Sequence, residues 1–235
     1  MSQGISPLAD ALVSCSNARR DTSRSAMPTY KLTYFDLRGR AEPSRLLFAV
    51  AGVEYEDVRI QREQWPNEKA SGKYPFGQMP VLEVDGQVIA QSIAIARYLA
   101  NEFGLAGKTN LEKAKVDMIV DAIGDVSKGL GEMWFANDEA KKAEAKEKCL
   151  TKTIPTTFTG LEKILMTNNG GDGFFVGDSL TMADLIFLAH TDYHVDQLKE
   201  ENTMAAFPKL TALRERILAQ PSVKQWVEAR PKTKI

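Results

Sequence analysis

The pattern of apolar residues changes near residue 104, and this change limits the possible folds more than any other feature. Before it, short segments rich in aromatic and β-branched residues, typical of strands, are combined with helical patterns. Beyond residue 110, strand signals nearly vanish and long helical patterns rich in Ala, Lys and Glu follow. The 235 residues suffice for two units that each bury a core. We therefore expect an α/β domain over residues 27–104, a linker over 104–110 and an all-helical domain over 110–235.

The first half opens with a strand–helix–strand unit. Tyr30–Phe35 is predicted to be one strand and Tyr55–Ile60 a second, because both are rich in aromatic or branched residues. Between them, Pro43 is tolerated in the first turn of a helix, and Gly52 is well placed to end it. A connection of this length implies two parallel strands and a right-handed crossover.

A hairpin and a helix complete this half. They follow an irregular polar segment over residues 61–78 that has room for one short helix. The dipeptide Asp85-Gly86 lies between two apolar runs and is a strong signal for a tight turn. Ser92 then precedes apolar residues at helical spacing. The order β-α-β and then β-β-α is that of a thioredoxin-like domain, in which helices pack on a four-stranded mixed sheet.

The second half is predicted to be all helical. One helix has a well-marked start, with Thr181 as the N-cap, Asp184 at the third helical position, and Leu180 facing Leu185 as a hydrophobic staple. The expected helices span residues 111–135, 138–166, 181–198, 207–220 and 221–229.

Residues 1–26 differ from the rest of the chain. They are rich in Ser, Ala and Arg, and Met27 opens the first clear structural segment. We interpret residues 1–26 as a disordered leader. An organelle transit peptide is the alternative, because Arg19, Arg20 and Arg24 lie among serines.

Charge and composition exclude several classes of function. The net charge of -1 argues against a nucleic-acid partner, which would favour a basic excess. No apolar run approaches the roughly 18 residues that cross a bilayer, so we expect no membrane partner. The two cysteines, Cys15 and Cys149, argue against a disulfide scaffold or a Cys-rich zinc site. The composition indicates a cytoplasmic protein.

Three positions in the first half combine an ordinary structural explanation with a chemical one. Tyr34 ends the first strand and is either a core residue or a phenol that donates a hydrogen bond to an anion. Ser92 can cap a helix, and the same helix start can bind a carboxylate. If the Met79-Pro80 bond is cis, it presents the Met79 backbone to a bound peptide.

The remaining polar candidates carry weaker signals. Arg40, Trp65 and Lys69 lie in connecting segments, which carry binding groups more often than their share but are usually surface. His190 and His194 have the i, i+4 spacing of a metal pair. The Glu that follows the first His in the zinc-protease motif is missing. We therefore interpret both histidines as polar positions on a helix.

Several segments form an ordered series of motifs. They are Tyr30–Phe35, Arg38–Glu42, Trp65-Pro66 with Lys69, Met79–Gly86, Gln91-Ser92, Ile95–Leu99 and Val176–Asp184. This series resembles the sigma-class glutathione transferases, and the resemblance runs from about Met27 to Ile235.

The resemblance implies a homodimer that binds glutathione as a cosubstrate and conjugates its thiol to hydrophobic electrophilic small molecules. In this family the thioredoxin-like domain binds glutathione and the helical domain forms the electrophile site. Tyr34 matches the catalytic tyrosine, and Asp125 matches an acidic residue that reaches the partner's glutathione. The other matches to glutathione contacts are Arg40, Trp65, Lys69, Met79, Pro80, Gln91 and Ser92.

The sequence also departs from some members of the class. In some vertebrate members an acidic trio at the dimer interface binds a divalent ion, but here Gly124 interrupts the set that contains Asp121 and Asp125. We therefore expect no metal. Isomerisation of prostaglandin H2 to the D form and a peroxidase side activity stay open. So do two non-catalytic alternatives, a ligand carrier and a crystallin-like structural protein.

Overall fold

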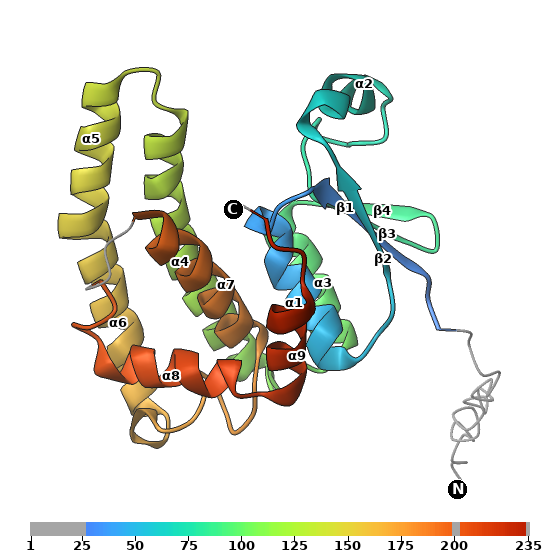
Figure 1. Cartoon of the computed structure of the whole chain (residues 1–235). Helices are drawn as coiled ribbons and strands as arrows, with labels where there is room; N and C mark the ends of the chain where they lie inside the picture. The colour runs from blue at the N-terminus through green and yellow to red at the C-terminus, as the bar shows by residue number, and fades with distance from the viewer. Residues whose placement is uncertain (1–26, 199–202, 234–235) are drawn as a thin grey trace, which may run out of the picture.

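The computed structural model describes residues 27–198 and 203–233, and it confirms the expected fold class. Figure 1 shows a sheet with its helices on one side of the molecule and a bundle of long helices on the other. The predicted leader lies outside the described residues. None of the described helices combines the length and the apolar composition that crossing a membrane would require.

The sheet has four strands in the order β2-β1-β3-β4. β1 pairs in parallel with β2, and the β1–β3 and β3–β4 pairs are antiparallel. Asp85 and Gly86 join β3 to β4 with φ of 48° and 82°, the left-handed pair that a two-residue hairpin turn requires. The mixed sheet and its hairpin are therefore as predicted. The strands are β1 (Tyr30–Phe35), β2 (Glu56–Ile60), β3 (Val81–Val84) and β4 (Gln87–Ala90).

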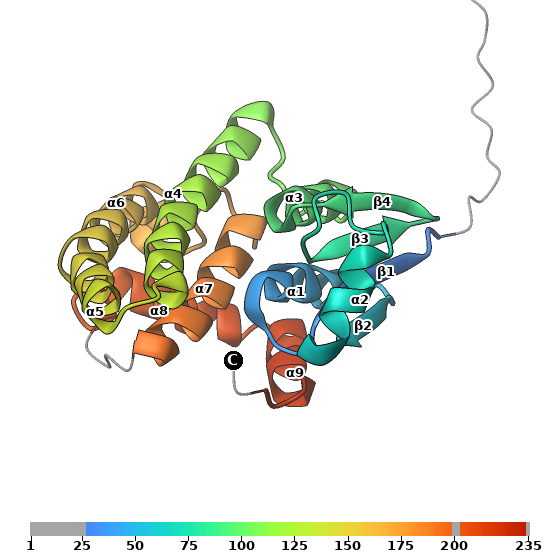
Figure 2. The same cartoon turned by 90° about the horizontal axis from the view of Figure 1, so that it is seen from above.

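Helices α1 and α3 lie between the sheet and the helical half, as Figures 1 and 2 show, and both contact α7. α1 ends at Gly52, whose φ of 64° gives the left-handed conformation of a helix C-terminus. The polar segment before β3 contains one short α-helix, as expected. The helices of this half are α1 (Glu42–Ala51), α2 (Trp65–Ala70) and α3 (Ser92–Glu102), with 3-10 turns η1 (Gly39–Ala41) and η2 (Arg62–Gln64).

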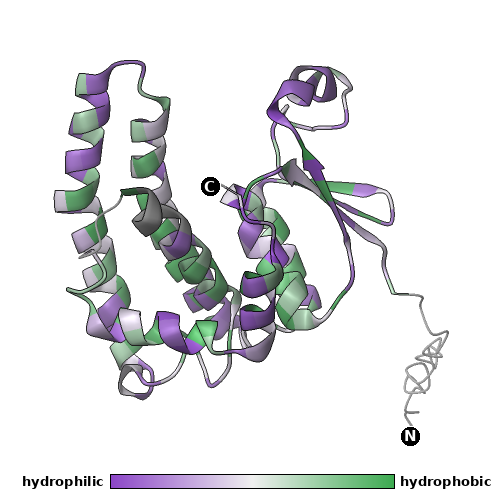
Figure 3. Cartoon of the chain, viewed as in Figure 1, coloured by the Kyte–Doolittle hydropathy of each residue, from purple (hydrophilic) through white to green (hydrophobic). Residues whose placement is uncertain are grey.

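In the second half, only helical elements occur among the described residues. Figure 3 shows α5 as mostly hydrophilic, and none of its residues is buried. α4, α6, α7 and α8 supply most of the buried apolar residues of this half. The elements are α4 (Asn110–Phe135), α5 (Glu139–Lys148), η3 (Cys149–Thr153), α6 (Ile154–Thr167), η4 (Asn169–Gly171), α7 (Met182–Leu198), α8 (Pro208–Leu218) and α9 (Pro221–Ala229).

The prediction of one continuous helix over residues 138–166 is wrong. The structure divides it into α5 and α6, joined by the π-helical turn η3. Pro155 explains the change, because it has no N–H for the bond that a continuous α-helix would make one turn back. A wider turn before the proline accommodates this loss.

The start of α7 matches its prediction. Thr181 directly precedes the helix, and the Asp184 carboxylate accepts hydrogen bonds from the Thr181 backbone N–H and hydroxyl, both at 2.8 Å. It also accepts from the Phe175 backbone N–H at 2.9 Å. Asp184 therefore fixes the loop before α7 as well as the helix start. The staple between Leu180 and Leu185 stays a prediction.

A chain of charged groups connects the two halves. The Glu42 carboxylate on α1 accepts hydrogen bonds from Trp226 Nε1 at 2.9 Å and from Arg230 Nη1 at 2.8 Å. Arg230 also reaches Asp192 on α7 at 3.4 Å. The C-terminal helix is therefore attached to the first helix of the chain.

Candidate active site

Tyr34 lies near the end of β1, an interior strand, and is 7% exposed. Its hydroxyl oxygen accepts a hydrogen bond from the Arg40 backbone N–H at 3.3 Å. The chain can fold back this closely because Gly39, with φ of +39°, has no side chain. A Cβ there would lie 2.9 Å from the Tyr34 hydroxyl oxygen and 2.5 Å from Leu37 Cδ1. A glycine is therefore required beside the tyrosine.

The environment of Tyr34 keeps its phenol protonated. Burial raises the pKa of Tyr34, and the Arg40 N–H together with the charges of Arg40, Arg45 and Arg62 only partly offsets this effect. The hydroxyl can therefore donate a hydrogen bond to an anion while its oxygen accepts one from Arg40.

A small hollow opens beside this turn. It lies where η1, the loop before β3, the end of β4 and the start of α3 come together. The residues that line it are Arg40, Phe76, Gln78, Met79, Pro80, Ala90, Gln91 and Ser92. Five of the nine predicted site residues are therefore brought to one place.

Two backbone features of the hollow can bind a peptide ligand. The Met79-Pro80 peptide bond is cis, a point that the sequence left open. Gln91 has φ of 73° and is the N-cap of α3, with no hydrogen bond from its side chain to the helix. The first N–H groups of a helix have no partner within it, so this end of α3 favours a carboxylate.

The position of Ser92 in α3 differs from the prediction. The sequence predicts Ser92 as the N-cap, but Ser92 is the first helical residue and Gln91 is the N-cap. The reason is the left-handed backbone of Gln91, which turns the chain into the helix one residue earlier. Both residues line the hollow, so the change leaves the predicted location intact.

The other predicted residues lie outside the lining of the hollow. Trp65 is half-buried on α2, with its ring edge-on to Phe35 and Tyr74 at centroid distances of 5.7 and 5.0 Å. Lys69, also on α2, is exposed, and its Cε lies 3.1 Å from where a Cβ on Gly77 would be. Asp125 is exposed on α4 and pairs with Lys128 at 3.0 Å.

Sequence reasoning missed three residues of the hollow. Gln78 and Ala90 directly precede predicted residues in the chain, and Phe76 is 65% exposed. Position next to the Met79-Pro80 and Gln91-Ser92 pairs was the only sequence signal for Gln78 and Ala90. Phe76 had none, because its exposure depends on the path of the loop.

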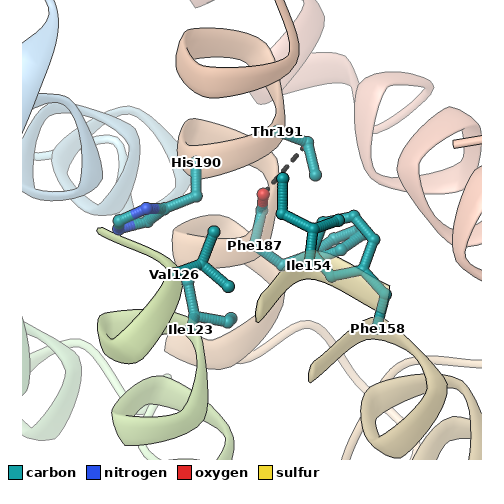
Figure 4. Close-up of a pocket in the computed structure, with 7 residues that line it drawn as sticks. All are labelled: Ile123, Val126, Ile154, Phe158, Phe187, His190 and Thr191. Atoms are coloured by element: carbon teal, nitrogen blue, oxygen red, sulfur yellow. Dashed lines mark hydrogen bonds between the residues drawn. The ribbon is translucent and has the colours of Figure 1, made fainter. Parts of the chain in front are cut away.

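A second, apolar cavity lies inside the helical half. Figure 4 shows its seven lining residues, with His190 extending from α7 to the side opposite Phe158. The Thr191 hydroxyl donates to the Phe187 carbonyl oxygen at 2.9 Å, which satisfies the one hydroxyl in the lining. The lining residues are Ile123 and Val126 from α4, Ile154 and Phe158 from α6, and Phe187, His190 and Thr191 from α7. This cavity is part of the helical core.

His190 is a neutral polar residue in this setting. Its Nδ1 lies 2.8 Å from the Ser127 hydroxyl oxygen on α4. Burial, and to a smaller extent the charge of Arg40, lowers the pKa of His190 to about 4. The side chain of His194 lies outside the described part of the structure. Within residues 27–198 and 203–233, no three His, Cys, Asp or Glu side chains gather closely enough to hold a metal ion.

Comparison with known families identifies the chain. Residues 30–101 match the family description "Glutathione S-transferase, N-terminal domain", and residues 124–230 match "Glutathione S-transferase, C-terminal domain". The chain belongs to the glutathione S-transferase family. The first match contains Tyr34 and the whole hollow, and the second contains Asp125 and His190.

Individual members of this family are similar over nearly their full length. Hematopoietic prostaglandin D synthase of Gallus gallus is 45% identical over 89% of this chain and 100% of its own. S-crystallin 4 of Enteroctopus dofleini is 38% identical over 88% of this chain and 99% of its own. Among solved structures, a nematode-specific GST of Caenorhabditis elegans has a TM-score of 0.80 and 40% identity, over 89% of this chain and 100% of its own.

Proposed function

We propose that this chain is a sigma-class glutathione transferase that uses Tyr34 to activate the glutathione thiol for attack on hydrophobic electrophiles. The observation that carries the proposal is the protonated Tyr34 hydroxyl, held by the Arg40 N–H on the turn that also lines the hollow. Membership of the glutathione S-transferase family supports the same reaction.

The energetics fit a phenol donor. A free thiol has a pKa of about 8.5, so only a few per cent is thiolate at neutral pH. Lowering this pKa by about two units requires about 2.7 kcal/mol of preferential stabilisation of the anion. A charge-assisted hydrogen bond from the Tyr34 hydroxyl can supply much of this energy. The tyrosine therefore acts as a donor rather than as a base.

The hollow suits the peptide part of glutathione. The backbone of Met79, beside Pro80, would bind the central residue of the tripeptide, and Arg40 would stabilise the turn and the anionic sulfur. Gln91, Ser92 and the N-terminus of α3 would bind the γ-glutamyl carboxylate, since a helix N-terminus favours negative charge. Trp65 and Lys69 on α2 would bind the glycine end, with Lys69 paired to its carboxylate.

The remaining parts of the proposal concern assembly and location. We infer a homodimer in which Asp125 of one protomer approaches the glutathione ammonium group bound to the other, and a cytoplasmic location. Residues 27–104 would form the glutathione domain, and residues 110–235 would supply the electrophile site. The reaction requires no metal, because the tyrosine hydroxyl provides the anion stabilisation.

Isomerisation of prostaglandin H2 to the D form is a second candidate reaction. The observation that favours it is the 45% identity to a relative named for this activity. We would incubate the protein with prostaglandin H2 and glutathione and separate the products by chromatography. Product of the D form above the level without enzyme is the expected result. A product mixture identical to the non-enzymatic one would remove this candidate and leave conjugation untouched.

The primary test compares wild type with Tyr34→Phe in conjugation of glutathione to a chromogenic aryl halide. We expect loss of the hydroxyl to lower kcat/KM at pH 7 by about 3- to 25-fold, the loss of thiolate when a bound thiol pKa of about 6.5 rises by one to two units. Tyr98→Phe is the matched control, because Tyr98 is a half-buried tyrosine on α3 that does not line the hollow. It should retain the wild-type rate.

The outcomes separate the alternatives. If wild type binds glutathione without turnover, the carrier or crystallin-like function replaces the transferase. Tight binding of a hydrophobic dye would then favour the carrier. If wild type turns over and Tyr34→Phe matches it, the assignment of Tyr34 is wrong.

A further inference from the structure

Arg45 is a fully buried charge on α1 that the proposed chemistry leaves unexplained. Its side chain is 0% exposed, although an arginine rarely leaves water completely. Burial of a charge is costly unless its donors find partners. The groups that Arg45 binds are therefore the evidence for its role.

Arg45 binds the turn over residues 37–40, whose Arg40 N–H contacts the Tyr34 hydroxyl. Its Nη1 donates to the Leu37 carbonyl oxygen at 2.8 Å and to the Arg38 carbonyl oxygen at 3.3 Å. The Arg40 N–H, two residues further along, is the group that donates to the Tyr34 hydroxyl oxygen. Arg45 Nη1 therefore binds the start of the turn, at Leu37 and Arg38, and the end of the same turn, at Arg40, contacts the Tyr34 hydroxyl.

Two carboxylates fix Arg45 from opposite directions along the chain. Its Nε lies 3.2 Å from an Asp57 oxygen on β2, and its Nη1 lies 3.4 Å from Glu42 Oε2 on α1. The Glu42 carboxylate is itself held by Trp226 and Arg230 at the C-terminal end of the chain. Both halves of the molecule therefore contribute to the position of the guanidinium.

We propose that Arg45 is a positioning residue for thiol activation: it fixes the turn over residues 37–40 and thereby the hydroxyl of Tyr34. This role rests on the proposed function of Tyr34. Arg45 acts through the turn, because its Nε and Nη1 donate to the backbone and to the two carboxylates. Its buried Nη2 has no hydrogen-bond partner among the described residues. The positive charge of Arg45 also lowers the pKa of Tyr34, which partly offsets the effect of burial.

The test measures the pKa of the bound glutathione thiol from the ultraviolet absorbance of its thiolate. Arg45→Lys keeps the charge but has one nitrogen, so it cannot bind the two carbonyls and Asp57 as Nη1 and Nε of the guanidinium do. We expect it to raise the thiol pKa by about one unit, half of the shift that activation requires. The kcat/KM profile should move to higher pH by the same amount, so that the rate recovers in alkaline solution. Arg45→Met, which has no donor, should shift both further.

Two controls separate positioning from general destabilisation. Arg216→Lys changes another arginine that donates to a backbone carbonyl, that of Gly173, but has no contact with Glu42, Asp57 or the turn, and it should leave the thiol pKa unchanged. S-methylglutathione, which has no thiol, should bind to Arg45→Lys as it binds to wild type. If Arg45→Met fails to fold, Arg45→Lys decides the question.

The contradicting results are distinct. A folded Arg45→Lys with the wild-type thiol pKa overturns the role of Arg45, and so does an equal shift in Arg216→Lys. If wild type itself leaves the thiol pKa near that of free glutathione, the proposed function of Tyr34 fails first. A shifted wild type with a graded loss in the two Arg45 variants supports both.

Discussion

Removal of the Asp184 carboxylate should destabilise the protein far more than removal of an equivalent carboxylate at a surface helix. Asp184 is 0% exposed and accepts hydrogen bonds from the backbone N–H groups of Phe175 and Thr181 and from the Thr181 hydroxyl. In Asp184→Ala, the two backbone N–H groups would stay buried without their partner.

The expected magnitude follows from these two groups. A buried donor that loses its acceptor costs about 1–3 kcal/mol, so the pair gives about 2–6 kcal/mol. A whole domain is stable by only about 5–15 kcal/mol. Asp138→Ala is the matched control, because Asp138 caps α5 through Ala140 N–H at 2.7 Å and Lys141 N–H at 3.4 Å but lies at the surface. Water can replace that cap, so its loss should cost about 1 kcal/mol.

Urea unfolding followed by tryptophan fluorescence, at one fixed protein concentration, measures both variants against wild type. We expect the loss of unfolding free energy in Asp184→Ala to be at least twice that in Asp138→Ala. Equal losses would refute the argument, because they would mean that burial of the two N–H groups adds nothing to the loss of a helix cap.

Three further predictions test other parts of the structure. Gly39→Ala should lower kcat/KM for glutathione by about 10- to 100-fold, because its Cβ would displace the Tyr34 hydroxyl that we propose to be catalytic, whereas Gly72→Ala, at φ of +77° with open space around it, should not. Equal activities would contradict the close contact. The folded protein lowers the pKa of His190 to about 4, whereas the unfolded chain has an ordinary histidine pKa of about 6.5. Between these two pH values the unfolded chain therefore binds a proton that the folded protein does not. As the pH falls through this window, the free energy of unfolding should decrease by up to about 3 kcal/mol. His190→Gln should remove this part of the pH dependence, measured as urea midpoints, and an unchanged slope would refute the assignment. Arg230→Met should lower the free energy of unfolding by about 2–3 kcal/mol, because it takes a charged donor from the buried Glu42 carboxylate. A urea midpoint equal to that of wild type would show that Trp226 and Arg45 suffice to hold Glu42.

Local sequence signals determined most of the fold. The β1 bounds, the Asp85-Gly86 turn, the Gly52 helix end and the Thr181–Asp184 start depend on residues a few positions apart, so the sequence contains the whole interaction. The division of residues 138–166 was missed although Pro155 was visible, because the response of the chain to a missing N–H depends on what packs beside it. Here that neighbour is α4, whose Gly129 lies against Cys149 and Thr153.

In the candidate site, too, the sequence indicated single residues but not the contacts between residues that are far apart in the chain. Residue type and family resemblance were enough to select Tyr34, Arg40, Met79, Pro80, Gln91 and Ser92. They could not reveal that Arg45 holds the turn beside Tyr34, because an arginine in a helix normally points to solvent. Its burial is decided by Asp57 on β2 and by Glu42, which Trp226 and Arg230 hold from 184 and 188 residues away. Only the tertiary structure brings these charges together, since their electrostatic interaction depends on distance in space and on the exclusion of water, neither of which is encoded in spacing along the chain.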